Sequence, residues 1–368
     1  MTIAILYRDE LKEYDFGPGH PFLGDRYPMF HRFLLENLPE DDNYRIIQAD
    51  GAADEDLLLI CHDDYITFTR EYYKAANLGL DFPGPFHRFH SGDNLPVGKP
   101  GRLEEAARLA VGQAKTACDL VQERRFPKAV SIGGGLHHAK PSYGEGFCLY
   151  NDVAFSAIYL RQRYKLDKIL ILDTDAHAGN GTSEYFYADP GILFIDIHQD
   201  PSFLYPGTGF AHQIGTGDGK GFNINIPMPV YAGYDSYRLV FEELVTPLVE
   251  EFKPRIIVRN GGSDPHFSDG LTNLGLPVAG FRLIGDNVRA LSGICEGKVI
   301  DLIASGYNRK VLPYAWLALI SGLAGFAIKI DEPEEIPQRF RQDPSLEATK
   351  AVVAEVKRNI KDHWRCFS

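Results

Sequence analysis

The sequence contains few cysteines, and none is placed to form a disulfide framework or a cysteine-ligated metal site. The five cysteines lie far apart and never form a Cys-x-x-Cys pair; they are Cys61, Cys118, Cys148, Cys295 and Cys366. Disulfide frameworks need paired cysteines, and cysteine-ligated zinc sites need closely spaced ones. We therefore expect reduced thiols in an intracellular protein.

Positive charge and long apolar runs are also scarce. The chain has 38 Lys and Arg against 50 Asp and Glu, a net charge of −12, which argues against a general affinity for nucleic acid or anionic membranes. No apolar run reaches the roughly 18 residues that cross a bilayer, and the N-terminus turns acidic and polar after one short apolar run, unlike a signal peptide. We expect a cytoplasmic protein without direct nucleic acid or membrane binding.

No repeat or low-complexity linker interrupts the 368 residues, and the apolar content of 44% is ordinary for a globular protein with a large core. Strand-like and helical stretches alternate along the chain. The expected strands are 3–7, 44–48, 129–132, 169–172, 192–197, 222–226, 255–259 and 298–303. The expected helices are 28–37, 63–77, 103–123, 150–164, 183–187, 234–251, 276–291, 311–324 and 345–363. Residues 79–100 and 199–221 are expected to form long loops.

This alternation predicts an α/β fold, because strands that alternate with helices are joined by crossovers that cover both faces of a sheet. We expect a three-layer α/β/α arrangement around a mostly parallel central sheet. Residues 1–368 are read as one domain, with a core of about 1–329 and a C-terminal extension, 330–368, that contains a terminal helix.

The stretch after the expected strand 169–172 carries the strongest chemical pattern. Asp173, Asp175 and His177 are spaced two apart, so an extended chain would direct all three side chains to one side. Open α/β sheets keep their sites at the carboxyl ends of strands, and mixed oxygen and nitrogen donors favour a divalent metal of the zinc class. In the alternative interpretation, Asp173 and Asp175 cap the following helix, and Gly179 to Gly181 only form a turn.

Loops after other expected strands bring matching chemistry. His137 and His138 follow a run of three glycines, Asp264 follows Asn-Gly-Gly-Ser, and Tyr307 follows Ser-Gly. Taken singly, each has an ordinary structural explanation: a packed histidine, a turn-forming aspartate or a core tyrosine. The segments Gly146–Phe147 and Leu204–Tyr205 add aromatic residues that together suit the walls of a narrow apolar slot.

The combined motifs resemble the histone deacetylase family within the arginase–deacetylase superfamily. The blocks that carry the resemblance occur in this order: GGGLHHAKPSYGEGFCLYND, LDTDAHAGNG, YPGTG, NGGSDPHFSDGL and SGY. The superfamily includes bacterial and archaeal deacetylase-like proteins and acetylpolyamine amidohydrolases. The resemblance covers about residues 15–325 and implies the arginase–deacetylase fold and a zinc-dependent amidohydrolase.

The resemblance implies one zinc ion per chain. The implied ligands are Asp175, His177 and Asp264, and three protein ligands leave an open position, as in catalytic zinc sites. It also implies that His137 and His138 transfer protons during amide hydrolysis.

The resemblance also implies the groups that support this chemistry. Asp173 is the carboxylate behind His137, and Asn180 is the partner of His138, where some relatives have Asp. Tyr307 is the implied hydrogen-bond donor to the oxyanion that forms during hydrolysis.

The substrate-binding residues are likewise implied by the resemblance. Phe147 and Tyr205 would sandwich the acyl-lysine methylenes, with Gly146 and Leu204 on the same two loops. Asp93 would accept N–H bonds from a peptide backbone at the rim. A structural potassium ion is implied near Asp173, Asp175, His177, Asp196 and Ile197, although Asp196 replaces a commoner Ser.

The identity of the amide stays open at this point. Leu271 stands where polyamine-specific relatives place an acidic gatekeeper, so we expect acetyl-lysine in proteins or peptides as substrate. Acetylpolyamines or other acetylated small amines are the alternative, and a non-catalytic acyl-lysine-binding module is a third. An arginase-like site with two manganese ions is disfavoured, because Gly179 stands where a further ligand is needed. The sequence leaves oligomerisation open.

Overall fold

The computed structural model describes residues 2–38, 40, 43–82 and 84–368. One eight-stranded sheet has the strand order β2-β1-β3-β8-β7-β4-β5-β6, and all of its paired strands are parallel. The strands are β1 Ile3–Leu6, β2 Tyr44–Ile47, β3 Lys128–Ile132, β4 Ile169–Asp173, β5 Ile192–Gln199, β6 Asn223–Met228, β7 Ile256–Gly261 and β8 Val299–Ile303.

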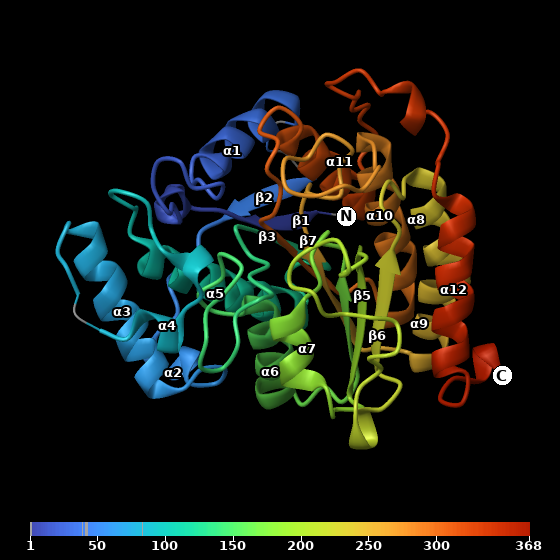
Figure 1. Cartoon of the computed structure of the whole chain (residues 1–368), viewed down its shortest axis with the longest axis horizontal. Coiled ribbons are helices and arrows are strands. Elements are labelled where there is room, and N and C mark those ends of the chain that lie inside the picture. The colour runs from blue at the N-terminus through green and yellow to red at the C-terminus, as the bar shows by residue number, and fades with distance from the viewer. Residues whose placement is uncertain (1, 39, 41–42, 83) are drawn as a thin grey trace.

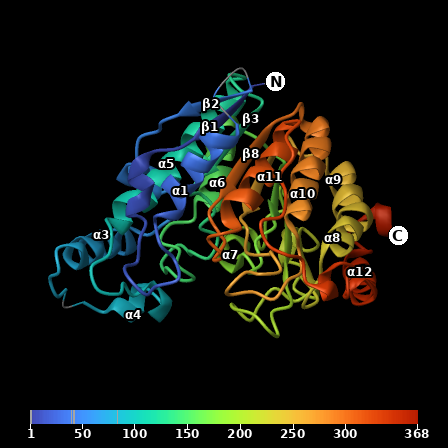
Figure 2. The ribbon, with the colours of Figure 1, turned by 90° about the horizontal axis from the view of Figure 1, so that it is seen from above.

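Helices cover both faces of this sheet (Figure 1). They are α1 Arg26–Asn37, α2 Asp54–Leu57, α3 Asp63–Asn77, α4 Phe86–Phe89, α5 Leu103–Gln122, α6 Asp152–Tyr164, α7 Asn180–Phe186, α8 Tyr234–Val240, α9 Thr246–Phe252, α10 Val278–Leu291, α11 Leu312–Ala324 and α12 Leu346–Ile360. Figure 2 shows α5 and α6 on one side of the sheet and α10 and α11 on the other.

The sequence of the central strands explains this layering. Every residue of β4 and of β7 is buried, as expected where helices cover both faces of a parallel sheet. The predicted three-layer α/β/α fold with a parallel sheet is confirmed. None of the helices formed by the described residues has the length and apolarity needed to cross a bilayer.

Three expectations about local structure were wrong. The loop expected at 79–100 contains α4 and a 3-10 turn, Gly92–Asn94; residue 83 lies outside the described residues. The helix expected at 234–251 is divided into α8, a π-helical turn and α9; Pro247 near the start of α9 has no N–H to donate within a continuous helix. The helix expected at 183–187 begins earlier, since Asn180 and Gly181 form its first turn and not a preceding loop.

The C-terminal extension packs on the β6 edge of the sheet. Helix α12 contacts β6 and α8, and the Trp364 indole N–H donates to the carbonyl of Gly221 at 2.7 Å. The Asp343 carboxylate accepts N–H bonds from Gly233 and Ser236, at the start of α8. Covering an edge strand in this way protects it from pairing with other chains. The boundary at residue 329 stays a prediction.

One buried ion pair links the central strands. Arg259 on β7 and Asp301 on β8 are register neighbours, hydrogen-bond to each other, and are each about 1% exposed. Asp301→Ala would leave the guanidinium charge buried without its partner, so we expect the free energy of unfolding in urea to fall by about 3–5 kcal/mol. The exposed pair Arg255–Asp167 is the control, and Asp167→Ala should change stability by less than about 0.5 kcal/mol. Equal effects of the two substitutions would contradict this prediction.

Candidate active site

The predicted site residues gather where four neighbouring strands end. Strands β3, β8, β7 and β4 are adjacent in the sheet and parallel, so the loops after them leave from the same edge. The loop after β3 carries His137 and His138, the loop after β4 carries Asp175 and His177, and the loops after β7 and β8 carry Asp264 and Tyr307.

Asp175, His177 and Asp264 form a group that can hold a metal ion. Their ligand atoms lie within 4.8 Å of one another, and His177 Nδ1 is 3.1 Å from both Asp175 Oδ1 and Asp264 Oδ2. Donors bound to one tetrahedral zinc at about 2.0–2.1 Å lie about 3.3 Å apart. Asp175 is only 3% exposed and Asp264 is 0% exposed. Two buried carboxylates beside one imidazole therefore fit a divalent cation in both spacing and charge.

The backbone reaches this arrangement differently from the expected extended chain. Strand β4 ends at Asp173, and Asp175 and His177 lie in the turn that follows. The Asp173 carboxylate accepts the N–H of Asp175 at 3.1 Å, and the Asp175 carboxylate accepts the N–H of His177 at 2.8 Å. Aspartate favours such turns because its side chain bonds to the backbone two residues ahead. The extended path expected through these three residues was therefore wrong.

The pKa values of these ligands depend on the charged groups packed beside them. Burial alone would lower the pKa of His177, but its hydrogen bonds to Asp175 and Asp264 outweigh burial and raise the pKa to about 10. Burial, reinforced by the Asp175 charge, raises the pKa of Asp264 to about 7. The imidazole thus holds a proton between two carboxylates. A cation bound there would displace that proton, because metal ligands bind in their deprotonated forms.

The paired histidines are held by different partners. His137 Nδ1 donates to Asp173 Oδ2 at 2.8 Å, while His138 Nδ1 donates to Asn180 Oδ1 at 2.7 Å. The two Nε2 atoms are 3.1 Å apart. Asn260 Nδ2 also donates to Asp173 Oδ2 at 2.9 Å, which fixes the carboxylate behind His137.

These partners give the two rings opposite charge preferences. Burial alone would lower the pKa of His137, but Asp173 and Asp175 outweigh it and raise the pKa to about 9. Burial and the neighbouring His137 and His177 hold the pKa of His138 well below its ordinary value. The hydrogen-bond network therefore assigns a protonated His137, whose Nε2–H donates to the Nε2 lone pair of a neutral His138.

The glycine run allows this loop to pass close to other groups. Gly135 has φ +118°, and a Cβ there would lie 2.3 Å from the Asn260 side-chain oxygen. The Asp152 carboxylate accepts N–H bonds from Gly135 and Leu136, at 2.8 and 2.7 Å for its closest oxygens, and so anchors the loop that carries the histidines. The roles of Asp152 and Asn260 were not predicted, although both residues lie in sequence blocks that carry the family resemblance.

Tyr307, in the loop after β8, lies in an aromatic setting. Its ring contacts Phe147 and Phe22, with centroid distances of 6.1 and 6.4 Å, and the Arg26 guanidinium lies 5.3 Å from its centroid. The Tyr307 N–H donates to Asp269 at 2.7 Å. Burial raises the pKa of its hydroxyl well above the ordinary value, so the hydroxyl stays protonated as a donor. The roles of Arg26 and Asp269 were also not predicted; Arg26 lies outside the blocks that carry the resemblance, whereas Asp269 lies within one of them.

The predicted substrate-binding residues do not all contact one another. The Tyr205 ring lies 5.1 Å from that of His138, whereas Phe147 packs on His20 at 4.7 Å and on Tyr307. Their predicted sandwich around a substrate chain stays a prediction. The side chains of Tyr205 and Leu271 are 41% and 39% exposed, and Leu204 is half-buried.

Asp93 already has partners in the protein. Its carboxylate accepts the Gly146 N–H at 3.0 Å and the Ser91 hydroxyl. It therefore positions the loop of Phe147, and its predicted bond to a peptide backbone stays a prediction.

The residues predicted to bind potassium include Asp196 and Ile197 on β5. Asp196 on β5 is the register neighbour of Asp173, is 1% exposed, and accepts the Gly179 N–H at 2.8 Å. Its other oxygen lies 2.9 Å from His198 Nδ1, and burial raises the pKa of its carboxyl. Ile197 is buried next to it. A potassium ion there stays a prediction.

The fold and the site together define an α/β protein of the arginase–deacetylase type with a candidate metal centre. A sequence model of the histone deacetylase domain matches residues 20–323. A probable deacetylase of Archaeoglobus fulgidus is 34% identical over the full length of both chains, and the acetoin utilization protein AcuC of Staphylococcus aureus is 35% identical over 90% of this chain and 82% of its own. The chain belongs to the histone deacetylase family and is a deacetylase-type hydrolase.

A solved structure agrees with this assignment at the level of the fold. The crystal structure of the HDA15 HD domain superposes with a TM-score of 0.83, covering 99% of this chain and 97% of that chain. The two sequences are only 22% identical, so this likeness shows the shared fold alone.

Proposed function

We propose that this deacetylase is zinc-dependent and hydrolyses the amide of N-acetyl-lysine, or of another short acyl-lysine, in proteins or peptides. The observation that carries the proposal is the cluster of Asp175, His177 and Asp264 ligand atoms within 4.8 Å, next to the paired histidines. Catalysis is assigned to residues 1–329, and residues 330–368 are assigned a covering role. The physiological compartment we propose is the cytoplasm.

Asp175, His177 and Asp264 would hold the cation. When bound, such an ion polarises an amide carbonyl and lowers the pKa of water from about 15.7 to about 7. Neutral His138 presents an unprotonated Nε2, which would exchange its contact with the His137 N–H for the attacking water, accept a proton from that water and later deliver it to the leaving amine. The imidazolium of His137, stabilised by Asp173, supplies positive charge beside the developing oxyanion. The Tyr307 hydroxyl donates a hydrogen bond to that oxyanion.

The rim favours an acyl-lysine side chain over a polyamine. Leu271 offers an exposed apolar surface where a carboxylate would be needed to attract a second cationic amine. We expect the zinc-loaded protein to hydrolyse acetyl-lysine peptides with a kcat/KM at least about 10-fold above that for acetylputrescine and acetylspermidine, the size of effect that one pocket contact gives. Leu271→Glu should shift this ratio toward the polyamines.

The same panel of substrates separates the alternatives. Higher efficiency on the acetylpolyamines would support the small-amine amidohydrolase instead. Binding of acyl-lysine peptides by the zinc-loaded protein without turnover would identify a non-catalytic binding module, and the proposed function would be wrong.

A further inference from the structure

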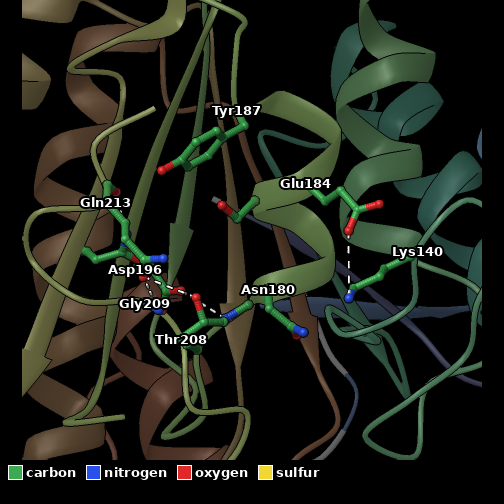
Figure 3. A pocket seen from close by; sticks show the side chains of 12 residues that line it. Lys140, Asn180, Glu184, Tyr187, Asp196, Thr208, Gly209 and Gln213 are labelled. Carbon is green, nitrogen blue, oxygen red and sulfur yellow. Dashed lines mark hydrogen bonds and ion pairs between the residues drawn. The ribbon is translucent and has the colours of Figure 1, made fainter. Parts of the chain in front are cut away.

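The amide that supports His138 is itself held by a carboxylate. Asn180 Oδ1 faces His138 Nδ1 at 2.7 Å, and Asn180 Nδ2 donates to Glu145 Oε1, also at 2.7 Å. Lys140 Nζ lies 3.1 Å from the same Glu145 oxygen and 3.7 Å from Glu184. Figure 3 shows Lys140 paired with Glu184 across from Asn180, all lining one cavity of about 350 Å³ beside the site.

The chemistry of these groups permits one orientation of the amide. An ionised carboxylate only accepts hydrogen bonds, so the Asn180 NH2 must face Glu145 and the Asn180 oxygen must face His138. An acceptor oxygen at 2.7 Å requires the proton of His138 on Nδ1, which leaves the lone pair on Nε2. The flipped amide would direct an N–H at Nδ1 and place the proton on Nε2, where the ring can no longer accept a proton from water.

The loop geometry holds Glu145 in this role. Lys140 and Glu145 both belong to the loop that follows the histidines, where the Lys140 N–H donates to the carbonyl of Tyr143 at 2.8 Å. Gly146 has φ +59°, and a Cβ there would lie 2.2 Å from the His138 ring, so the loop lies directly on that ring. The Glu145 and Lys140 side chains are 15% and 28% exposed, which shelters their ion pair from solvent.

We propose that Glu145 is a positioning residue for deacylation: it fixes the orientation of the Asn180 amide and thereby keeps Nε2 of His138 unprotonated. Lys140 holds the Glu145 carboxylate in place. The role depends on the function proposed above. The chain thus still has a carboxylate behind His138. This carboxylate belongs to Glu145 and acts through the Asn180 amide, which lies between them.

An exchange of the two groups tests the proposal. Asn180→Asp alone sets two carboxylates against each other, and we expect kcat on an acetyl-lysine peptide to fall about 10–100-fold, as for other groups behind a ligand or base. Adding Glu145→Gln supplies the missing N–H donor and should bring kcat back to within about 3-fold of the Asn180 enzyme. Glu145→Leu alone should lower kcat about 10-fold with KM unchanged, because Glu145 does not touch the substrate. Glu184→Gln is the matched control and should have no effect.

A spectroscopic readout keeps the test independent of turnover. The ¹⁵N shifts of the His138 ring, assigned by comparison with His138→Ala, should report the Nδ1–H tautomer in the unaltered protein and a mixture with Nε2–H in Glu145→Leu. Thermal unfolding verifies that each variant is folded. If the unaltered protein hydrolyses none of the acylated amines, the proposed function fails while the tautomer measurement still decides the role of Glu145. The positioning role is wrong if Glu145→Gln does not restore the kcat of Asn180→Asp. It is also wrong if Glu145→Leu has the same His138 tautomer as the unaltered protein.

Discussion

Asp264→Asn is expected to release the metal and reduce deacylation by at least about 10³-fold. Asparagine keeps the shape of the side chain, so it preserves the contacts of Asp264 with the Ser305 hydroxyl at 2.8 Å and the Ala176 N–H at 3.2 Å. It removes one of the two carboxylate charges that face His177. A metal ion contributes several kcal/mol of transition-state stabilisation, and each 1.36 kcal/mol corresponds to about 10-fold in rate.

The measurement is metal content per chain together with kcat/KM. We expect about one zinc per unaltered chain and far less in Asp264→Asn after dialysis, because a three-ligand site loses an anionic ligand. Asp218→Asn, at an exposed turn, should keep both metal and activity. Two manganese ions per chain would instead indicate an arginase-like site. Full zinc content and full activity in Asp264→Asn would show that Asp264 is not a ligand.

Local sequence patterns were sufficient to predict the sheet and the edge of the sheet where the site residues lie. Continuous apolar runs mark strands covered on both faces, and β4 and β7 are such strands. Since parallel strands end at one edge, polar residues just after those runs had to lie near one another. The structure accordingly brings Asp175 and Asp264 together. The Ala176 N–H donates to Asp264, although these two residues are 88 positions apart in the sequence.

The groups that orient this chemistry were not predictable in the same way. Asp152, Asn260 and Glu145 act through hydrogen bonds to residues 16 or more positions away, and no local periodicity encodes such pairings. Their identities depend on how loops pack after the sheet has formed. The extended path expected through Asp175 failed for a related reason. The aspartates bond to the backbone just ahead of them, and this local preference ends the strand at Asp173.

Sequence alone also underestimated irregular helical structure. The segment 79–100 lacks a helical period, yet short turns such as α4 form there because aromatic side chains pack on α3. Phe89 stacks on Phe68 at a centroid distance of 4.6 Å, and Phe86 lies 4.6 Å from Tyr72. Tertiary contacts of this kind override weak local propensity.

Tyr307→Phe is expected to lower kcat about 10²–10³-fold while leaving the fold and the zinc content intact. The substitution removes only the hydroxyl, so the packing of the ring against Phe147, Phe22 and Arg26 is retained. Because burial keeps this hydroxyl protonated, it is available as a donor to the oxyanion. The loss of one such preorganised donor has this magnitude in other hydrolytic enzymes. Steady-state kcat and KM on an acetyl-lysine peptide, with metal analysis, measure the effect.

The buried Tyr237 provides a control for the half-buried Tyr307. Tyr237 is fully buried, its pKa is raised by burial and then by Asp264 and Asp175, and its hydroxyl has no hydrogen-bond partner among the described residues. Tyr237→Phe should therefore leave kcat within about 3-fold of the unaltered enzyme, because no donor to the reacting atoms is lost. The oxyanion role is specific to Tyr307 only if the two substitutions differ. Unchanged kcat in Tyr307→Phe, or an equal loss in both variants, would show that the Tyr307 hydroxyl is not a specific hydrogen-bond donor in the transition state.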